Sequence, residues 1–431
     1  MNSNRKEFFK FVIPSIIAFA LSGIYAIVDG FFVGNTIGDA GLSAINMAYP
    51  VVAVIQALGT GIGMGGAVYY SINKAEHNEK KAGEFAAVAW WLLVLTSIRL
   101  TVIIYFFANP ILAALGMQGA ILHYGVEYIK IIALGALLQV LGTGLIPLMR
   151  NYGGAFMAVI AMIGGFVTNI ILDYLFVWVQ GYGMKGAALA TIIGQGITAL
   201  IAVAYSIYKK RFFVRASLNH VKSIIGSIFR VGLAPFGLAL TPNISLIIIN
   251  KFSVLYGGEK AIATYACIGY IVSIIYLILQ GVGDGSQPLM SQYYGEKRES
   301  DLKDIQKTAY AFAIFLAIAG AALVFLSRWK VGVLFGTSPE VNINTGNIIP
   351  IFLISVPFVA ITRVATASFY ATEKSVLSYI LTFIEPVLML IFMLILPPLF
   401  GGQIMIWWST VFARIASALL ALYLTKKSQT Y

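Results

Sequence analysis

The stretch "KKRFFVRASLNHVKSIIGSIFR" (residues 209–230) divides the chain at its midpoint and is its longest basic turn. The 431 residues around it are 59% hydrophobic and only 11% charged, and the mean hydropathy is +0.88. Soluble domains usually carry about 25% charged residues. Apolar runs on both sides of the stretch reach the roughly 20 residues that a helix needs to cross a bilayer. The sequence therefore predicts an all-α polytopic membrane protein.

Twelve apolar segments follow one another along the chain, six on each side of the basic turn. Their centres lie near residues 20, 57, 97, 137, 167, 197, 242, 277, 317, 360, 387 and 414. An even number of spans places both termini on one side of the membrane. Most of the 29 Lys and Arg residues fall in turns on that side, whereas the opposite turns hold Lys185, Lys251, Lys260, Arg328 and Lys330. Because positive residues accumulate inside, both termini are predicted to be cytoplasmic. We also expect the chain to lie in the plasma (inner) membrane.

The two sides of the basic turn repeat one another. "GIGMGGAVYYSINKAEHNEKK" (61–81) aligns with "GVGDGSQPLMSQYYGEKRESD" (281–301), and three glycines coincide at a shift of about 220 residues. We therefore predict an N-terminal six-helix lobe over 1–208, a basic cytoplasmic linker over 209–230 and a C-terminal six-helix lobe over 231–431. Six spans per half give both halves the same orientation, so a pseudo-twofold axis along the membrane normal should relate them. Such repeats are typical of transporters.

Composition also argues against several functions. The formal net charge of +12 is spread over turns between apolar runs, so it indicates membrane topology rather than nucleic-acid binding. The single cysteine, Cys267, excludes an intrachain disulfide and a thiolate metal centre. No nucleotide-binding or hydrolase motif is present, and no soluble insertion is long enough for a catalytic module. We expect neither enzymatic activity nor a cofactor.

The fifth span, "FVTNIILDYLFV" (166–177), places Asn169 and Asp173 one turn apart on the same helix face. An ionisable residue at the centre of a span costs roughly 2.5–3.5 kcal/mol, so it needs a reason. The first span carries Asp29 and the sixth carries Thr191. All four side chains offer oxygen. Such a set suits a hard cation, and a pair of carboxylates also suits a proton.

Structural roles remain open for the same residues. An amide such as Asn169 often joins neighbouring helices, and Thr191 could bond to its own helix backbone. Arg99 in the third span could pair with one of the two acids, which would make part of the set a buried ion pair.

The second half offers different charged residues, and we treat Asp284, Arg363 and Glu385 as secondary candidates for the ion site. A cap or loop role would equally explain Asp284, which lies at the glycine-rich end of the eighth span. Glu385 precedes a proline and could pair with Arg363 or with Arg414. The two halves therefore differ in chemistry, and we expect the ion site mainly in the first.

The chain resembles the multidrug and toxic compound extrusion (MATE) family, in particular its bacterial multidrug exporters. The resemblance covers nearly the whole sequence and rests on three segments: "IPSIIAFALSGIYAIVDGFFVGNTIGDAGLSAI" (13–45), "NIILDYLFV" (169–177) and "GMKGAALATIIGQ" (183–195). It implies two lobes that alternate access and export organic, mainly cationic compounds by Na⁺ or H⁺ antiport. It also implies a ligand set for the coupling ion: Asp29, Asn169, Asp173 and Thr191, with the backbone carbonyl of Ala187 as an extra ligand.

From this resemblance we expect amphipathic or cationic small molecules as substrates, the lipid bilayer as surroundings, no nucleic acid, and a monomer. Residue types leave Na⁺ and H⁺ undecided, because the same oxygen atoms serve either ion. A flippase for a lipid-linked or amphipathic substrate is the main alternative, although it would need a cationic cavity. A receptor or membrane enzyme without transport activity is a lesser one.

Overall fold

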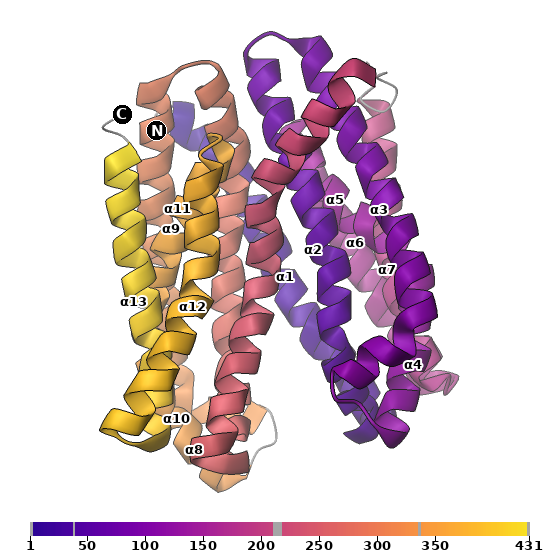
Figure 1. Cartoon of the computed structure of the whole chain (residues 1–431), viewed down its shortest axis with the longest axis vertical. Helices are drawn as coiled ribbons and strands as arrows, with labels where there is room; N and C mark the ends of the chain where they lie inside the picture. Colours follow the sequence, from indigo (N-terminus) through magenta and orange to yellow (C-terminus); the bar gives the residue numbers. More distant parts are fainter. Residues whose placement is uncertain (1–2, 38, 210–217, 335–337, 429–431) are drawn as a thin grey trace. The chain divides into compact units, whose positions relative to one another are not determined.

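The computed structural model describes residues 3–37, 39–209, 218–334 and 338–428, and every regular element within them is helical (Figure 1). The first half contains α1 (Ser3–Ile37), α2 (Asp39–Ala75), α3 (Glu79–Ala114), α4 (Gly119–Leu134), α5 (Ala136–Asn151), α6 (Ala155–Asp173), the π-helix η1 (Tyr174–Val179) and α7 (Gly183–Tyr208). The second half contains α8 (Leu218–Gly295), α9 (Glu299–Leu334), α10 (Pro339–Ile354), α11 (Val356–Ala371), α12 (Ser375–Phe400) and α13 (Gly402–Ser428).

These helices account for the twelve predicted spans. Within the described residues, 10 segments are long and apolar enough to cross a membrane individually, and two bent helix pairs supply one span each. The 78-residue α8 contains two of the ten, because Gly258 breaks it with a φ of 64°. The all-α fold and the span count predicted from the apolar runs are confirmed.

The internal repeat is visible in the helix boundaries. The ends of α3 and α9 differ by 220 residues (from 79 to 299), and the same shift relates the bent pair α4–α5 to the bent pair α10–α11. The first pair bends by 61° next to Gly135 and the second by 43° next to Ser355. The duplication therefore extends to the breaks within helices.

The chain packs as two compact units, each with its own core. One unit comprises Met1–Ala20, Thr241–Met290 and Glu299–Tyr431, and the other comprises Leu21–Leu240 and Ser291–Arg298. We call them the C-terminal unit and the N-terminal unit. They divide α1 and α8 between them, so they differ from the predicted lobes 1–208 and 231–431. Those boundaries stay a prediction, and much of the predicted linker lies outside the described residues.

The aligned glycine runs explain this exchange of helix ends. In the N-terminal unit, a Cβ on Gly61 would lie 2.8 Å from the carbonyl oxygen of Gly232 at the start of α8. In the C-terminal unit, a Cβ on Gly281 would lie 2.8 Å from Cα of Ile16 in α1. Each glycine run thus permits direct backbone contact with the beginning of the other half's first helix. Any larger side chain would separate these helices.

Candidate functional site

The helices α6 and α7 form a close pair that holds four of the predicted site residues. A Cβ on Gly194 would lie 2.7 Å from the carbonyl oxygen of Gly165 and 2.8 Å from Cβ of Asn169. Further along, Thr198 donates a hydrogen bond of 3.2 Å to the carbonyl oxygen of Ala161. The two helices therefore run antiparallel in close contact, and the face of α6 that carries Asn169 lies directly against α7.

The predicted residues of this helix pair are buried together. The exposed fractions are 2% for Asn169, 0% for Asp173, 5% for Thr191 and 1% for Ala187. Asn169 and Asp173 are one turn apart on α6, and Thr191 lies one turn before the contact glycine of α7. We call this group, Asn169, Asp173, Thr191 and Ala187, the α6–α7 pocket.

Two side chains of the α6–α7 pocket lack hydrogen-bond partners within the described part of the chain. Both amide atoms of Asn169 and the hydroxyl oxygen of Thr191 are buried without one. A buried polar group left without a partner costs about 1–3 kcal/mol, so a folded protein rarely retains several without use. The proposed structural roles for Asn169 and Thr191, a bond between helices and a bond to the helix backbone, are absent among these residues.

The α-helix ends at the candidate carboxylate. Regular α-helical bonding stops at Asp173, and the next residue begins the six-residue π-helix η1. Short π-helical segments in α-helices occur frequently at functional sites. The sequence "YLFVWV" gives no sign of this change, and the structure reveals it.

The first helix approaches the same place. The ring of Phe32 on α1 lies 6.5 Å from the ring of Tyr174, and the ring of Phe31 stacks on Trp178 at 6.4 Å. The backbone of α1 thus brings position 29 close to the junction of α6 and η1. The side chain of Asp29 itself lies outside what the structure describes. Arg99 is exposed on α3 and forms no ion pair with any described residue.

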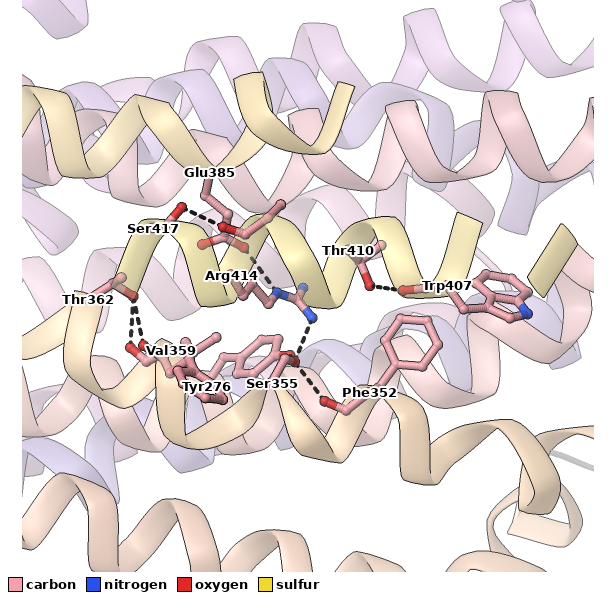
Figure 2. A network of polar contacts seen from close by, with 12 residues as sticks. Tyr276, Phe352, Ser355, Val359, Thr362, Glu385, Trp407, Thr410, Arg414 and Ser417 are labelled. Carbon is pink, nitrogen blue, oxygen red and sulfur yellow. Dashed lines mark hydrogen bonds and ion pairs between the residues drawn. The ribbon is translucent and has the colours of Figure 1, made fainter. Parts of the chain in front are cut away.

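The C-terminal unit contains a charged cluster that is internally paired. Figure 2 shows Arg414 of α13 between Glu385 of α12 and Ser355, with its Nε 3.1 Å from Glu385 Oε1 and its Nη1 3.2 Å from Ser355 Oγ. The guanidinium also lies 4.8 Å from the ring centre of Tyr276. Of the two partners considered for Glu385, the structure thus identifies Arg414.

The other two secondary candidates lie near this cluster. Asp284 accepts hydrogen bonds from Tyr370 at 2.6 Å and from Gln280 at 2.7 Å, so its carboxylate is held by neutral donors. Arg363 on α11 lies within electrostatic range of Glu385 and Asp284. Among the described residues, no group of three His, Cys, Asp or Glu side chains could hold a metal ion. A cation site would therefore depend on mixed oxygen donors.

The repeat shows how differently the two halves use equivalent positions. Because α6 and α12 begin at Ala155 and Ser375, Asn169 corresponds to Met389 and Asp173 to Met393, and both methionines are fully buried. Since α7 and α13 begin at Gly183 and Gly402, Thr191 corresponds to Thr410, which donates to the carbonyl oxygen of Trp407 at 2.7 Å. Among the described residues, Asn169 and Thr191 thus have buried polar atoms without hydrogen-bond partners, whereas their equivalents Met389 and Thr410 do not.

Comparison with known proteins decides the family. The model of the MatE family matches residues 14–175 and 236–395, one stretch in each half. The chain belongs to the MatE family. The resemblance to multidrug and toxic compound extrusion proteins is therefore confirmed, and the double match agrees with the internal repeat.

Curated relatives of this MatE protein include the multidrug export protein MepA of Staphylococcus haemolyticus. It is 25% identical over 422 residues, which cover 97% of this chain and 92% of the relative. MepA of Staphylococcus saprophyticus is 26% identical over 434 residues, which cover 99% of this chain and 95% of the relative.

Solved structures share the fold. An outward-facing multidrug resistance MATE family transporter matches with a TM-score of 0.91 at 22% identity, covering 99% of this chain and 96% of the other. A transporter of the MOP superfamily from Pyrococcus furiosus matches with the same TM-score, identity and coverage. This likeness supports the all-α fold.

One residue of the N-terminal unit escaped the sequence analysis. Gln139 on α5 has an exposed fraction of 0%, and neither of its amide atoms has a hydrogen-bond partner among the described residues. A single amide in an apolar span is not distinctive by itself. The repeat could have revealed it, because the equivalent position is Val359.

Proposed function

We propose that this chain is a secondary active exporter that expels organic, mainly cationic drugs or toxic compounds in exchange for Na⁺ or H⁺. Membership of the MatE family and the likeness to staphylococcal multidrug export proteins support export of such compounds. The bound ion would lie in the α6–α7 pocket, with Asp29 of α1 as a further ligand.

The observation that carries this proposal is the chemistry of the α6–α7 pocket. Fully buried Asn169 and Thr191 hold polar atoms without partners next to the carboxylate of Asp173. Amide, hydroxyl and carboxylate oxygens are ligands for hard cations, and the backbone carbonyl of Ala187 would add another. A cation that entered the pocket would neutralise the acid and satisfy these oxygens at once.

Coupling requires that ion and drug favour different states of the protein. The carboxylate of Asp173 lies where α6 changes into η1, and α1 packs on η1 through Phe31 and Phe32. Binding of a cation would change the packing of these three elements. Alternating access would follow if the drug binds more tightly to the state without the ion.

The proposal also includes the orientation of the chain, its oligomeric state and its partners. Both termini would be cytoplasmic, the chain would work as a monomer in the plasma membrane, and its partners would be amphipathic small molecules and lipid. It would need no cofactor and would catalyse no covalent reaction. Transport would depend only on the gradients of ion and drug.

The flippase alternative depends on a cationic cavity. In the C-terminal unit, the charge of Arg414 is balanced by Glu385. This pairing weakens the case for a cluster of free arginines that could bind a pyrophosphate. A receptor or enzyme would be favoured instead by nucleotide-stimulated turnover of the purified protein.

The proposal is tested by uptake of a fluorescent organic cation into proteoliposomes that contain the full chain. A Na⁺ gradient or a pH gradient is imposed, and wild type is compared with Asp29→Asn and Asp173→Asn. Gradient-driven uptake that is lost in both variants, at equal protein content, supports the site and names the ion. Undiminished uptake by both variants would place ion coupling elsewhere.

A further inference from the structure

Gln139 is a buried amide that the proposed ion site has not yet used. Its side chain is fully buried in the N-terminal unit, and both its oxygen and its nitrogen lack a hydrogen-bond partner among the described residues. An amide in this situation costs free energy twice, once for each atom. A ligand that binds the oxygen would offset part of that cost.

The position of Gln139 on α5 places it towards the α6–α7 pocket. A Cβ on Gly135 would touch Ile192 of α7, and a Cβ on Gly142 would lie 2.8 Å from Oε1 of Gln195. Positions 135, 139 and 142 follow one stripe of a helix. Gln139 therefore lies on the α5 face that packs against α7, at the level of the turn that carries Thr191. Side chains on a helix lean towards its N-terminus, here towards the turn with Gly135.

The repeat indicates that packing does not require an amide here. The equivalent position on α11 is Val359, and its exposed fraction is 2%. Asn169 and Asp173 of the pocket are likewise replaced by buried methionines, Met389 and Met393. This position is thus polar in the half that contains the α6–α7 pocket and apolar in the other half.

Resting on the proposed function, we propose that Gln139 contributes its amide oxygen to the coupling ion as an additional ligand from α5, and that this ion is a monovalent metal cation such as Na⁺. Amide oxygens bind hard cations directly. A proton carried by a carboxylate has no need of several neutral oxygens, because it forms one bond and one hydrogen bond. Together Asn169, Thr191 and Gln139 supply three neutral oxygens beside the acid, which suits a metal cation.

Equilibrium binding of radioactive Na⁺ to the purified full-length protein tests this role. Gln139→Leu keeps the approximate volume but removes the oxygen, and we expect Na⁺ affinity to fall by about tenfold or more. Gln139→Glu replaces the amide oxygen by a carboxylate oxygen, so Na⁺ binding should persist and should weaken as the pH is lowered. The matched control is Gln306→Leu, which removes a glutamine that bonds to Ser368 in the C-terminal unit. It should leave Na⁺ affinity unchanged.

The outcomes separate this inference from the proposed function. Loss of Na⁺ binding in Asp173→Asn with wild-type affinity in Gln139→Leu would overturn the role of Gln139 and leave the ion site standing. Wild type that binds no Na⁺ but exchanges drug for protons would also overturn it. Unchanged ion-coupled transport in Asp173→Asn would leave drug export standing and place ion coupling outside the α6–α7 pocket, whereas wild type that transports no drug under either gradient would overturn the proposed function. If Gln139→Leu fails to fold, Na⁺ affinity that falls more steeply with decreasing pH in Gln139→Glu than in wild type supports the role, and an identical pH dependence overturns it.

Discussion

If Asn169 binds the coupling ion as proposed, its function opposes the stability of the ion-free protein. Its amide is buried without a partner in the described structure, so it raises the free energy of the folded state. We predict that Asn169→Leu increases thermal stability in ion-free buffer, by about 1 kcal/mol, because it removes an unsatisfied polar group. The same variant should lose ion-driven drug uptake.

Thermal unfolding and proteoliposome uptake, measured on the same preparation, check whether Asn169→Leu gains stability and loses uptake. A destabilised variant that still couples ion and drug would show that Asn169 holds the helices together rather than binding an ion. Such trade-offs between stability and activity are common at binding sites.

Arg414 and Glu385 represent the opposite case, in which buried charges satisfy each other. Their side chains have exposed fractions of only 7% and 20%. Breaking a buried pair from one side leaves an uncompensated charge, and we expect Arg414→Met to destabilise the protein by about 3 kcal/mol.

The double variant Arg414→Met with Glu385→Met should recover most of this loss, since it removes both charges. Unfolding of the two single variants and of the double variant in denaturant measures the coupling. Additive losses would mean that the pair contributes little. Wild-type Na⁺ affinity in the double variant is also expected, because the pair lies in the C-terminal unit.

Among the helices, the apolar runs predicted the number and the order of the membrane spans. Twelve spans, their order and their repeat follow from the length of the runs and the position of charges. The breaks within the fourth and tenth spans do not, because Gly135 and Ser355 are residues that ordinary helices tolerate. Likewise, nothing in "YLFVWV" separates a π-helix from an α-helix, since backbone register depends on packing rather than on side-chain type.

The candidate site was predicted in part for similar reasons. Asn169, Asp173 and Thr191 are polar residues at helical spacing in apolar spans, which is a strong signal. Gln139 is isolated in its span, so only its equivalence to Val359 distinguishes it. The exchange of helix ends between units also escaped prediction, because it depends on glycines that permit backbone contact in three dimensions.

The π-helix η1 offers a way to observe ion binding directly. Trp178 belongs to η1, and its indole stacks on Phe31 of α1 with an interplanar angle of 7°. If a cation at Asp173 changes the packing of η1, the surroundings of this indole change with it. We predict a shift in fluorescence when the ion is added to a variant in which Trp178 is the only tryptophan.

The shift should be absent in the same background with Asp173→Asn. Trp329 of α9, kept as the only tryptophan in a parallel variant, belongs to the other unit and serves as the control. An equal response at both positions would indicate a general effect of salt instead of ion binding at the pocket.

In the whole molecule, a duplicated fold is combined with one candidate ion site. The family model matches both halves, yet Asn169 and Thr191 of the first half have buried polar atoms without a partner among the described residues, and their equivalents Met389 and Thr410 do not. In the second half, methionines replace Asn169 and Asp173, and Arg414 pairs with Glu385. The two halves thus have similar scaffolds, and we expect only the first to bind the coupling cation.

Ion flux driven by the drug tests most directly whether the coupling ion binds in the α6–α7 pocket. Because coupling is reciprocal, a gradient of organic cation alone should move the coupling ion in the opposite direction. Proteoliposomes with wild type should show Na⁺ or H⁺ efflux on addition of the drug outside, and Asp173→Asn should take up drug, if at all, without this efflux. Drug-driven ion flux that persists in Asp173→Asn would contradict the placement of the coupling ion in the α6–α7 pocket.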